Sequence, residues 1–220
     1  MPSDLEPPCA RLLRAGAQSL SDAELLAVVL RNGRPGASAL VLARDLLERA
    51  GGLAGLPGAC RNRLRTNGTG HAKVAAVLAA AEIACRIAAA EVPKRRPLSQ
   101  PAKVARYLDL RYGHLGQEVM GALYCDARHG LMGDRELFRG TLHRAAVEPR
   151  EILKEGLLRG AAAFVLFHTH PSGDPAPSRE DLLFTRRMAR ASEVIGLHLV
   201  DHLVVGTGGR WVSLKDRGGW

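Results

Sequence analysis

Two histidines separated by one residue stand at the end of an apolar run in the segment FVLFHTHPSGDPAPSRED (164–181). Residues i and i+2 of a β-strand point to the same face, so we expect His168 and His170 to lie side by side. Two imidazoles on one face can bind a first-row metal ion. Asp181 can supply a third ligand if the intervening loop folds back to the strand end. Such a set leaves a fourth tetrahedral position open, which is typical of catalytic zinc sites.

A simpler interpretation of the same residues is structural. The tetrapeptide SRED (178–181) is a capping box, with Ser178 as the N-cap residue and Asp181 at the third helical position. A His-x-His pair alone is usually incidental. The full combination of apolar strand, His-x-His, seven residues, Ser, two residues and Asp favours a metal site. Both roles can coexist at the start of one helix.

The elements expected around this segment alternate between strands and helices, which predicts an α/β domain. Two strands separated by ARHG indicate a hairpin. The expected strands cover 118–126, 131–140, 163–170, 198–206 and 210–214, and the expected helices cover 102–113, 148–162 and 178–195.

The N-terminal part of the chain has only helical patterns. We expect helices over 20–30, 37–52 and 70–91, the first opened by a capping box of Ser21 and Glu24. The following segment, AEVPKRRPLSQP (90–101), has three prolines and a basic triplet, which predicts a linker. The predicted organisation is a helical domain at 1–90, a linker at 91–101 and a metal-binding domain at 102–220.

His168, His170, Ser178 and Asp181 stand at the spacing of the signature of JAMM/MPN-domain metalloproteases, which this segment closely resembles. The whole chain resembles the RadC family, bacterial proteins historically labelled as DNA-repair proteins. Besides HTHPSGDPAPSRED, the resemblance is carried by LSDAELLAVVLRNG (20–33), FRGTLHRAAVEPREILKEGL (138–157) and DHLVVG (201–206). The more common family sequence has Asn between the histidines, where this chain has Thr169, whose side chain is expected to point away from the ligands.

The resemblance implies a zinc hydrolase that cleaves a peptide or isopeptide bond of a polypeptide. Its fold would be a JAMM/MPN-type mixed β-sheet with flanking helices, preceded by a small all-α domain similar to a helix-hairpin-helix. His168, His170 and Asp181 would bind Zn²⁺, and Ser178 would help to stabilise the oxyanion.

The resemblance also implies a general base. By motif position the base would be Glu118, in EVMGALYCD, with Glu151 as the competing candidate. Asp201 and His202 also match the family pattern. They are either a polar pair at a strand end or side chains that contact the metal ligands, and the sequence assigns them no role.

A second hypothesis is a DNA-associated accessory protein in which the metal site is structural or vestigial. The segment TNGTGHAKVAAVLAA (66–80) resembles a helix-hairpin-helix, in which Gly68, Gly70 and Lys73 would contact the DNA backbone. Residues 1–98 have 14 Lys and Arg against 8 Asp and Glu, which permits such contact. An apolar residue usually stands where this chain has Thr69, so an ordinary turn between helices is the alternative.

Composition excludes several other classes. No run of about 18 apolar residues and no apolar signal core occur, so we expect a cytoplasmic protein without membrane association. The four cysteines form no C-x-x-C pair, which argues against a zinc knuckle or a disulfide framework. The H-E-x-x-H pattern of zincins and the P-C-x-x-C pattern of zinc deaminases are also absent. The remaining histidines lack ligand spacing: His71, His114, His129, His143 and His198.

Overall fold

The computed structural model describes residues 6–59, 61–65, 69–94, 99–140 and 148–218. The chain divides into two compact units, Met1–Ala84 and Cys85–Trp220. The division falls inside one long helix, a few residues before the end of the helical domain that the sequence predicts at residue 90. The linker expected at 91–101 lies partly outside the described residues.

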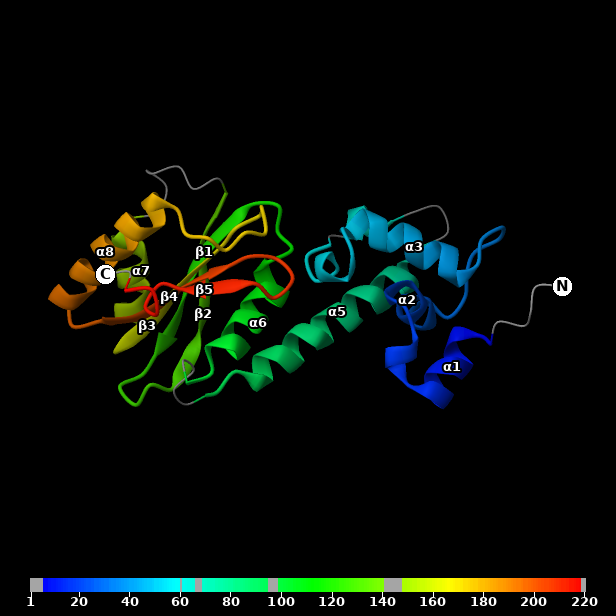
Figure 1. The fold of residues 1–220 in the computed structure, drawn as a ribbon, viewed down its shortest axis with the longest axis horizontal. Coiled ribbons are helices and arrows are strands. Elements are labelled where there is room, and N and C mark those ends of the chain that lie inside the picture. The colour runs from blue at the N-terminus through cyan, green and yellow to red at the C-terminus, as the bar shows by residue number, and fades with distance from the viewer. Residues whose placement is uncertain (1–5, 60, 66–68, 95–98, 141–147, 219–220) are drawn as a thin grey trace. The chain divides into compact units, whose positions relative to one another are not determined.

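The first unit is helical, as the sequence predicts. Its helices are α1 (Pro8–Ala15), α2 (Asp22–Leu30), α3 (Ala39–Ala50), α4 (Arg61–Leu64) and the first part of α5 (His71–Glu91) (Figure 1). Two 3₁₀ turns accompany them, η1 (Ala17–Ser19) and η2 (Leu53–Gly55). The predicted capping box is confirmed, because Ser21 and Glu24 exchange both hydrogen bonds at the start of α2. Leu26, Leu42, Leu46, Leu64 and Val77 are among the side chains that form the core of this unit.

The second unit contains a five-stranded sheet in the order β2-β1-β3-β4-β5. Its strands are β1 (Glu118–Cys125), β2 (Leu131–Gly140), β3 (Ala163–Thr169), β4 (His198–Val205) and β5 (Trp211–Ser213). β3 and β4 run parallel, and the other neighbouring strands pair antiparallel, so the sheet is mixed. The α/β fold class and the β1–β2 hairpin are therefore confirmed.

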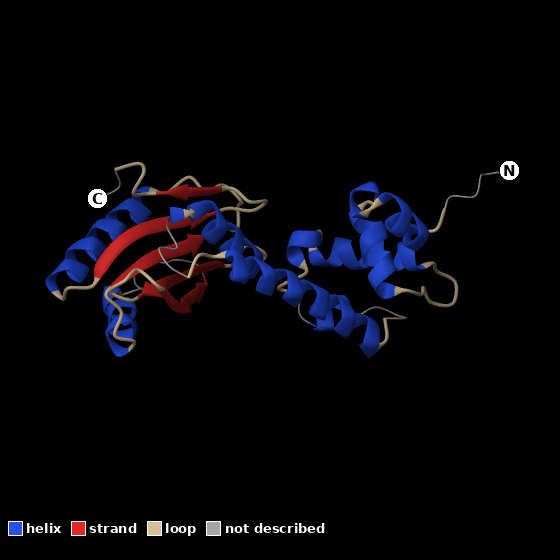
Figure 2. Ribbon diagram, turned by 90° about the horizontal axis from the view of Figure 1, so that it is seen from below, coloured by secondary structure: helices blue, strands red, loops and turns tan. Residues whose placement is uncertain are grey.

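Helices cover both faces of this sheet (Figures 1 and 2). α6 (Pro101–Tyr112) packs on one face, where Val119 and Phe167 enter its core. α7 (Pro149–Leu158) and α8 (Arg179–Val194) pack on the other, where Met120 and Leu166 enter a second core. Because successive residues of a strand alternate between faces, His168 belongs to the α7 and α8 face. The predicted helices of this unit are confirmed to within a few residues.

The described cysteines form no disulfide. Cys9 is exposed, whereas Cys85 and Cys125 are buried, and all three are free. Cys60 lies outside the described residues. Burial, helped by the charge of Asp126, raises the pKa of the Cys125 thiol to about 11. Within the described part of the chain, no helix is long and apolar enough to cross a membrane.

Candidate metal centre

The two histidines come from the end of the fully buried central strand β3. His168 is completely buried, and His170 stands just beyond the last residue of the strand. The backbone amide of His170 donates a hydrogen bond to the carbonyl of Val205, with nitrogen and oxygen 2.9 Å apart. This bond keeps the chain extended beside β4 past the end of β3, so both imidazoles stay on one face.

The carboxylate comes from the first turn of α8. The predicted capping box is confirmed: Ser178 is the N-cap residue, and Asp181 is at the third helical position. Oδ2 of Asp181 accepts hydrogen bonds from the amide and the hydroxyl of Ser178, at 2.7 and 2.6 Å. Oδ1 faces Nε2 of His168 at 3.3 Å. The capping box therefore fixes the carboxylate, with Oδ1 turned toward His168.

Two glycines let the loop between His170 and Ser178 pack against the end of β4. Gly173 has φ +80°, and a Cβ there would lie 2.4 Å from Oγ1 of Thr207. A Cβ on Gly206 would lie 2.3 Å from the carbonyl oxygen of Gly173. Side chains at either position would push the loop away from the strand. This close packing brings the N-terminus of α8 back to the end of β3.

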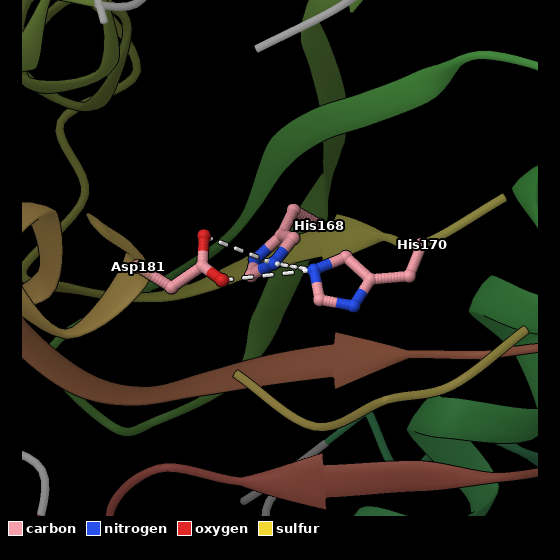
Figure 3. A group of neighbouring side chains, drawn as sticks. All are labelled: His168, His170 and Asp181. Atoms are coloured by element: carbon pink, nitrogen blue, oxygen red, sulfur yellow. Dashed lines mark hydrogen bonds and ion pairs between the residues drawn. The ribbon is translucent and has the colours of Figure 1, made fainter. Parts of the chain in front are cut away.

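His168, His170 and Asp181 converge on one point (Figure 3). Nε2 of His168 lies 2.9 Å from Nε2 of His170, and Nε2 of His170 lies 3.6 Å from Oδ2 of Asp181. One ligand atom from each residue lies within 4.8 Å of the others. Among the described residues, His168, His170 and Asp181 form the only group of three or more His, Cys, Asp or Glu side chains that could hold a metal ion.

The second nitrogen of each imidazole has its own partner. Nδ1 of His170 lies 2.7 Å from the carbonyl oxygen of Asp174. A carbonyl only accepts, so Nδ1 carries the hydrogen and the neutral ring presents an Nε2 lone pair to the site. Nδ1 of His168 is paired with Nε2 of His202 at 2.7 Å. In both rings Nε2 is therefore the atom that faces the other ligands.

Charge in the site is arranged as a cation site requires. Burial alone would raise the pKa of Asp181, but hydrogen bonds with His168 and His170 and the charge of His168 outweigh it. The pKa of Asp181 therefore lies far below its usual range. The hydrogen bond with Asp181 raises the pKa of His170, against the opposing effect of burial. The carboxylate is thus ionised at neutral pH and attracts positive charge to the Nε2 atoms.

The spacing of the ligand atoms fits zinc. A tetrahedral zinc ion with bonds of about 2.0–2.1 Å holds its nitrogen and oxygen ligands about 3.3 Å apart. Nε2 of His168 lies 2.9 Å from Nε2 of His170 and 3.3 Å from Oδ1 of Asp181, which is close to this spacing. Nε2 of His170 lies 3.6 Å from the other carboxylate oxygen, Oδ2, and one atom from each residue lies within 4.8 Å of the others. Two neutral imidazoles with facing lone pairs would repel at 2.9 Å, so this arrangement calls for a cation or a proton between them. The ligand roles of the three residues stay predictions.

Comparison with known proteins places this site in a family. Residues 98–219 match the family model of the RadC-like JAB domain, and residues 2–75 match that of the UPF0758 N-terminal region. The chain belongs to the UPF0758 family. This finding confirms the resemblance to RadC proteins that the sequence motifs indicate.

Relatives in this family cover nearly the whole chain. A UPF0758 protein of Marinobacter nauticus is 44% identical over 218 residues, 99% of this chain and 96% of the relative. One of Chloroflexus aurantiacus is 42% identical over 212 residues, 96% of this chain and 92% of the relative. One of Bacillus licheniformis is 40% identical over 218 residues, 98% of this chain and 96% of the relative. These names describe a family rather than a reaction.

In this UPF0758 protein the predicted base, Glu118, is the first residue of β1. Met120 pairs with His168 across β1 and β3, so Glu118 lies on the same face of the sheet. Its charge contributes to the raised pKa of His170, which indicates proximity. The competing candidate, Glu151, is exposed on α7 and forms an ion pair with Arg150. The geometry therefore favours Glu118, whose role stays a prediction.

The predicted DNA-contacting residues of the first unit are only partly described. Gly68 lies outside the described residues. A Cβ on Gly70 would meet no atom within 4 Å, so packing does not require glycine there. Nζ of Lys73 donates a hydrogen bond to the carbonyl of Gly33 at 2.5 Å. Thr69 is buried, and its hydroxyl bonds to the carbonyl of Leu64. Contact with DNA stays a prediction.

Sequence reasoning left two alternatives for His202 and missed Thr185. His202 is completely buried in β4 and bonds to His168, which fits the alternative of a side chain that contacts a proposed ligand. Thr185 on α8 bonds to His202 and to the backbone of Asp181. A strand-helix-strand pattern predicts parallel neighbouring strands, and that signal could have placed β4 beside the histidines. Asp201 instead accepts hydrogen bonds from Ser213 and from the Lys215 amide, away from the ligands.

Proposed function

We propose that this protein is a zinc-dependent hydrolase that cleaves an amide bond, peptide or isopeptide, in a polypeptide. The observation that carries the proposal is the convergence of two imidazole Nε2 atoms and an ionised carboxylate at the buried end of β3. Three ligands leave a fourth tetrahedral position for the reactants, as in catalytic zinc sites. The RadC-like JAB domain assigned to residues 98–219 supports the same class.

In this proposal His168, His170 and Asp181 hold the zinc ion. When bound there, zinc supplies Lewis acidity, which polarises an amide carbonyl and makes water more acidic. His168 and Asp181 are buried, so their geometry is fixed before any substrate arrives. Hydrogen bonds from Ser178 to Oδ2 hold the carboxylate in place.

Glu118 is proposed as the general base. Its carboxylate takes a proton from the attacking water and passes it to the leaving amine nitrogen. Its place at the first residue of β1, on the face of His168, supports this role. Its partly buried position also keeps it accessible to substrate.

Ser178 is proposed to help stabilise the oxyanion. Its hydroxyl hydrogen is directed to Oδ2 of Asp181. A contact with substrate therefore requires rotation of this hydroxyl, while the Ser178 amide continues to hold Asp181. Ser178 is thus proposed to have two roles: it positions the proposed ligand Asp181, and its hydroxyl stabilises the oxyanion.

Metal content by mass spectrometry tests the proposal first. The wild type, refilled with zinc and dialysed, should hold about one zinc per chain, and His168→Ala and Asp181→Asn should hold none. No zinc in the refilled wild type would overturn the proposal.

Hydrolysis is then measured on a mixture of peptides and isopeptide-linked conjugates by mass spectrometry of the products. Glu118→Gln should keep zinc and lose cleavage, whereas Glu151→Gln should keep both. Equal cleavage by the wild type and Glu118→Gln would remove Glu118 as the base. Zinc binding without cleavage of any amide would overturn the hydrolase assignment.

A further inference from the structure

The motif DHLVVG (201–206) places a histidine behind the site that the proposed reaction does not use. His202 lies in β4 with no exposed surface, between His168 of β3 and Thr185 of α8. Leu166 is its partner across β3 and β4, so His202 faces the same side of the sheet as His168. A fully buried imidazole needs partners at both ring nitrogens, and His202 has them.

Which atom donates in each of these hydrogen bonds follows from the bond between Thr185 and the backbone of Asp181. Oγ1 of Thr185 lies 2.6 Å from the carbonyl oxygen of Asp181, which can only accept. Two oxygens at that distance repel unless a hydrogen lies between them, so the Thr185 hydroxyl donates to Asp181. Its oxygen must then accept from Nδ1 of His202, 2.6 Å away. His202 therefore carries its hydrogen on Nδ1 and a lone pair on Nε2.

The same logic extends to the metal ligand. Nε2 of His202 lies 2.7 Å from Nδ1 of His168, and a lone pair on the first requires a hydrogen on the second. His168 then presents an Nε2 lone pair toward His170 and Asp181. The opposite direction would put the hydrogen of His168 on Nε2, where it would block coordination. With a hydrogen on Nδ1 and an accepting lone pair on Nε2, His202 is a neutral imidazole.

We propose that His202 and Thr185 are positioning residues that fix the tautomer of His168, so that its Nε2 lone pair faces the metal site. This inference rests on the proposed function only in naming that site. The chain of bonds starts at the backbone of Asp181 and ends at His168, so it joins two ligands through α8 and β4. Metal-bound histidines commonly donate to a carboxylate, a carbonyl or water. Here the acceptor is the neutral imidazole of His202. The Thr185 hydroxyl fixes which nitrogen of that imidazole carries the hydrogen.

A matched pair of substitutions isolates the hydroxyl. Thr185→Val keeps the shape of the side chain but removes the acceptor of His202, whereas Thr185→Ser keeps the hydroxyl. His202→Phe removes the link at its centre. Thermal unfolding of each full-length variant shows whether it folds.

The first readout uses the metal-free protein at pH 8. Long-range ¹H–¹⁵N spectra distinguish a histidine with hydrogen on Nδ1 from one with hydrogen on Nε2. We expect the Nδ1–H form of His168 in the wild type and in Thr185→Ser, and a mixture of forms in Thr185→Val. Hydrogen on Nε2 of His168 in the wild type would overturn the inference. This readout needs no metal, so it decides the inference even if the wild type binds no zinc and the proposed function fails.

The second readout is zinc affinity, measured by competition with a chromophoric chelator. Loss of a hydrogen-bond partner of a ligand typically weakens metal binding about 10–100-fold. We expect a loss of that size in Thr185→Val and His202→Phe, and an affinity close to that of the wild type in Thr185→Ser. Equal affinities in the folded Val and Ser variants would show that the hydroxyl does not direct His168 and would overturn the inference.

Discussion

The hydroxyl of Thr169 accepts a hydrogen bond from the backbone amide of Val119, with oxygen and nitrogen 3.0 Å apart. The described pairing of β1 and β3 ends at Met120 and His168. The side chain of Thr169 therefore extends the contact between the two strands by one residue, directly beside Glu118. It does so from the face opposite to His168, which explains how a residue between two proposed ligands can support the site without approaching the proposed metal position.

Thr169→Val should destabilise the protein and leave zinc in place. The substitution keeps the shape of the side chain but leaves the buried Val119 amide without its acceptor, at a cost of about 1–3 kcal/mol. Urea unfolding measures the loss, and mass spectrometry measures the zinc. Thr169→Ser, which keeps the hydroxyl, serves as control. Equal stability of the Val and Ser variants would show that this bond contributes little.

Ser178→Ala should weaken zinc binding as well as the start of α8. The variant removes the hydroxyl that donates to Oδ2 of Asp181, and loss of an N-cap costs about 0.5–2 kcal/mol. Ser21→Ala is the matched control, because Ser21 closes the equivalent capping box with Glu24 in the other unit. Both variants should lose stability in urea, and only Ser178→Ala should lose zinc affinity. Unchanged affinity there would mean that the Ser178 amide alone holds the ligand.

The parts of the site that obey short-range rules could be predicted from the sequence. Two-residue periodicity put His168 and His170 on one face, and the capping-box pattern put Ser178 and Asp181 at the start of a helix. These rules connect residues at most a few positions apart, so they need no knowledge of the tertiary fold. The short helix α1 was not predicted: no side-chain hydrogen bond caps its N-terminus, and the proline at its start and Gly16 directly after its end are the signals that could have indicated it.

The contacts of His202 with His168 and Thr185 could not be predicted in the same way. His168 and His202 are 34 positions apart, and Thr185 and His202 are 17 apart. The strand-helix-strand pattern indicates that β3 and β4 are neighbours, but it does not give their register. That register contains an irregularity between Phe164 and Val165, which decides that His202 lies opposite Leu166. The pattern of strands and helices along the sequence carries no information on such a shift.

Lys73→Met should destabilise the first unit. The Lys73 ammonium bonds to the Gly33 carbonyl, 40 positions away in the sequence, and its removal should cost about 1 kcal/mol. Lys103→Met removes the same charge from an exposed position on α6 and should leave stability unchanged. Thermal unfolding compares the two variants. Full stability of Lys73→Met, combined with weaker retention of a DNA duplex at low salt, would instead support the DNA contact that the sequence suggests.

Zinc affinity should depend on pH through His170. The hydrogen bond with Asp181 raises the pKa of His170 above 6.5, and a proton on Nε2 prevents coordination. Below that raised pKa, affinity should fall about tenfold for each unit of pH, and above it this dependence should vanish. Competition titrations between pH 5.5 and 8.5 measure the profile.

The same titrations test whether Glu118 lies close to His170. Its negative charge is one of the causes that raise the pKa of His170, so Glu118→Gln should lower that pKa and shift the affinity profile toward lower pH. Glu151→Gln is the control, because Glu151 is exposed and paired with Arg150, and it should leave the profile unchanged. If both variants followed the wild-type profile, Glu118 would lie too far from His170 to act as the base. A shift in Glu118→Gln alone would support its position beside the ligands by a measurement that requires no substrate.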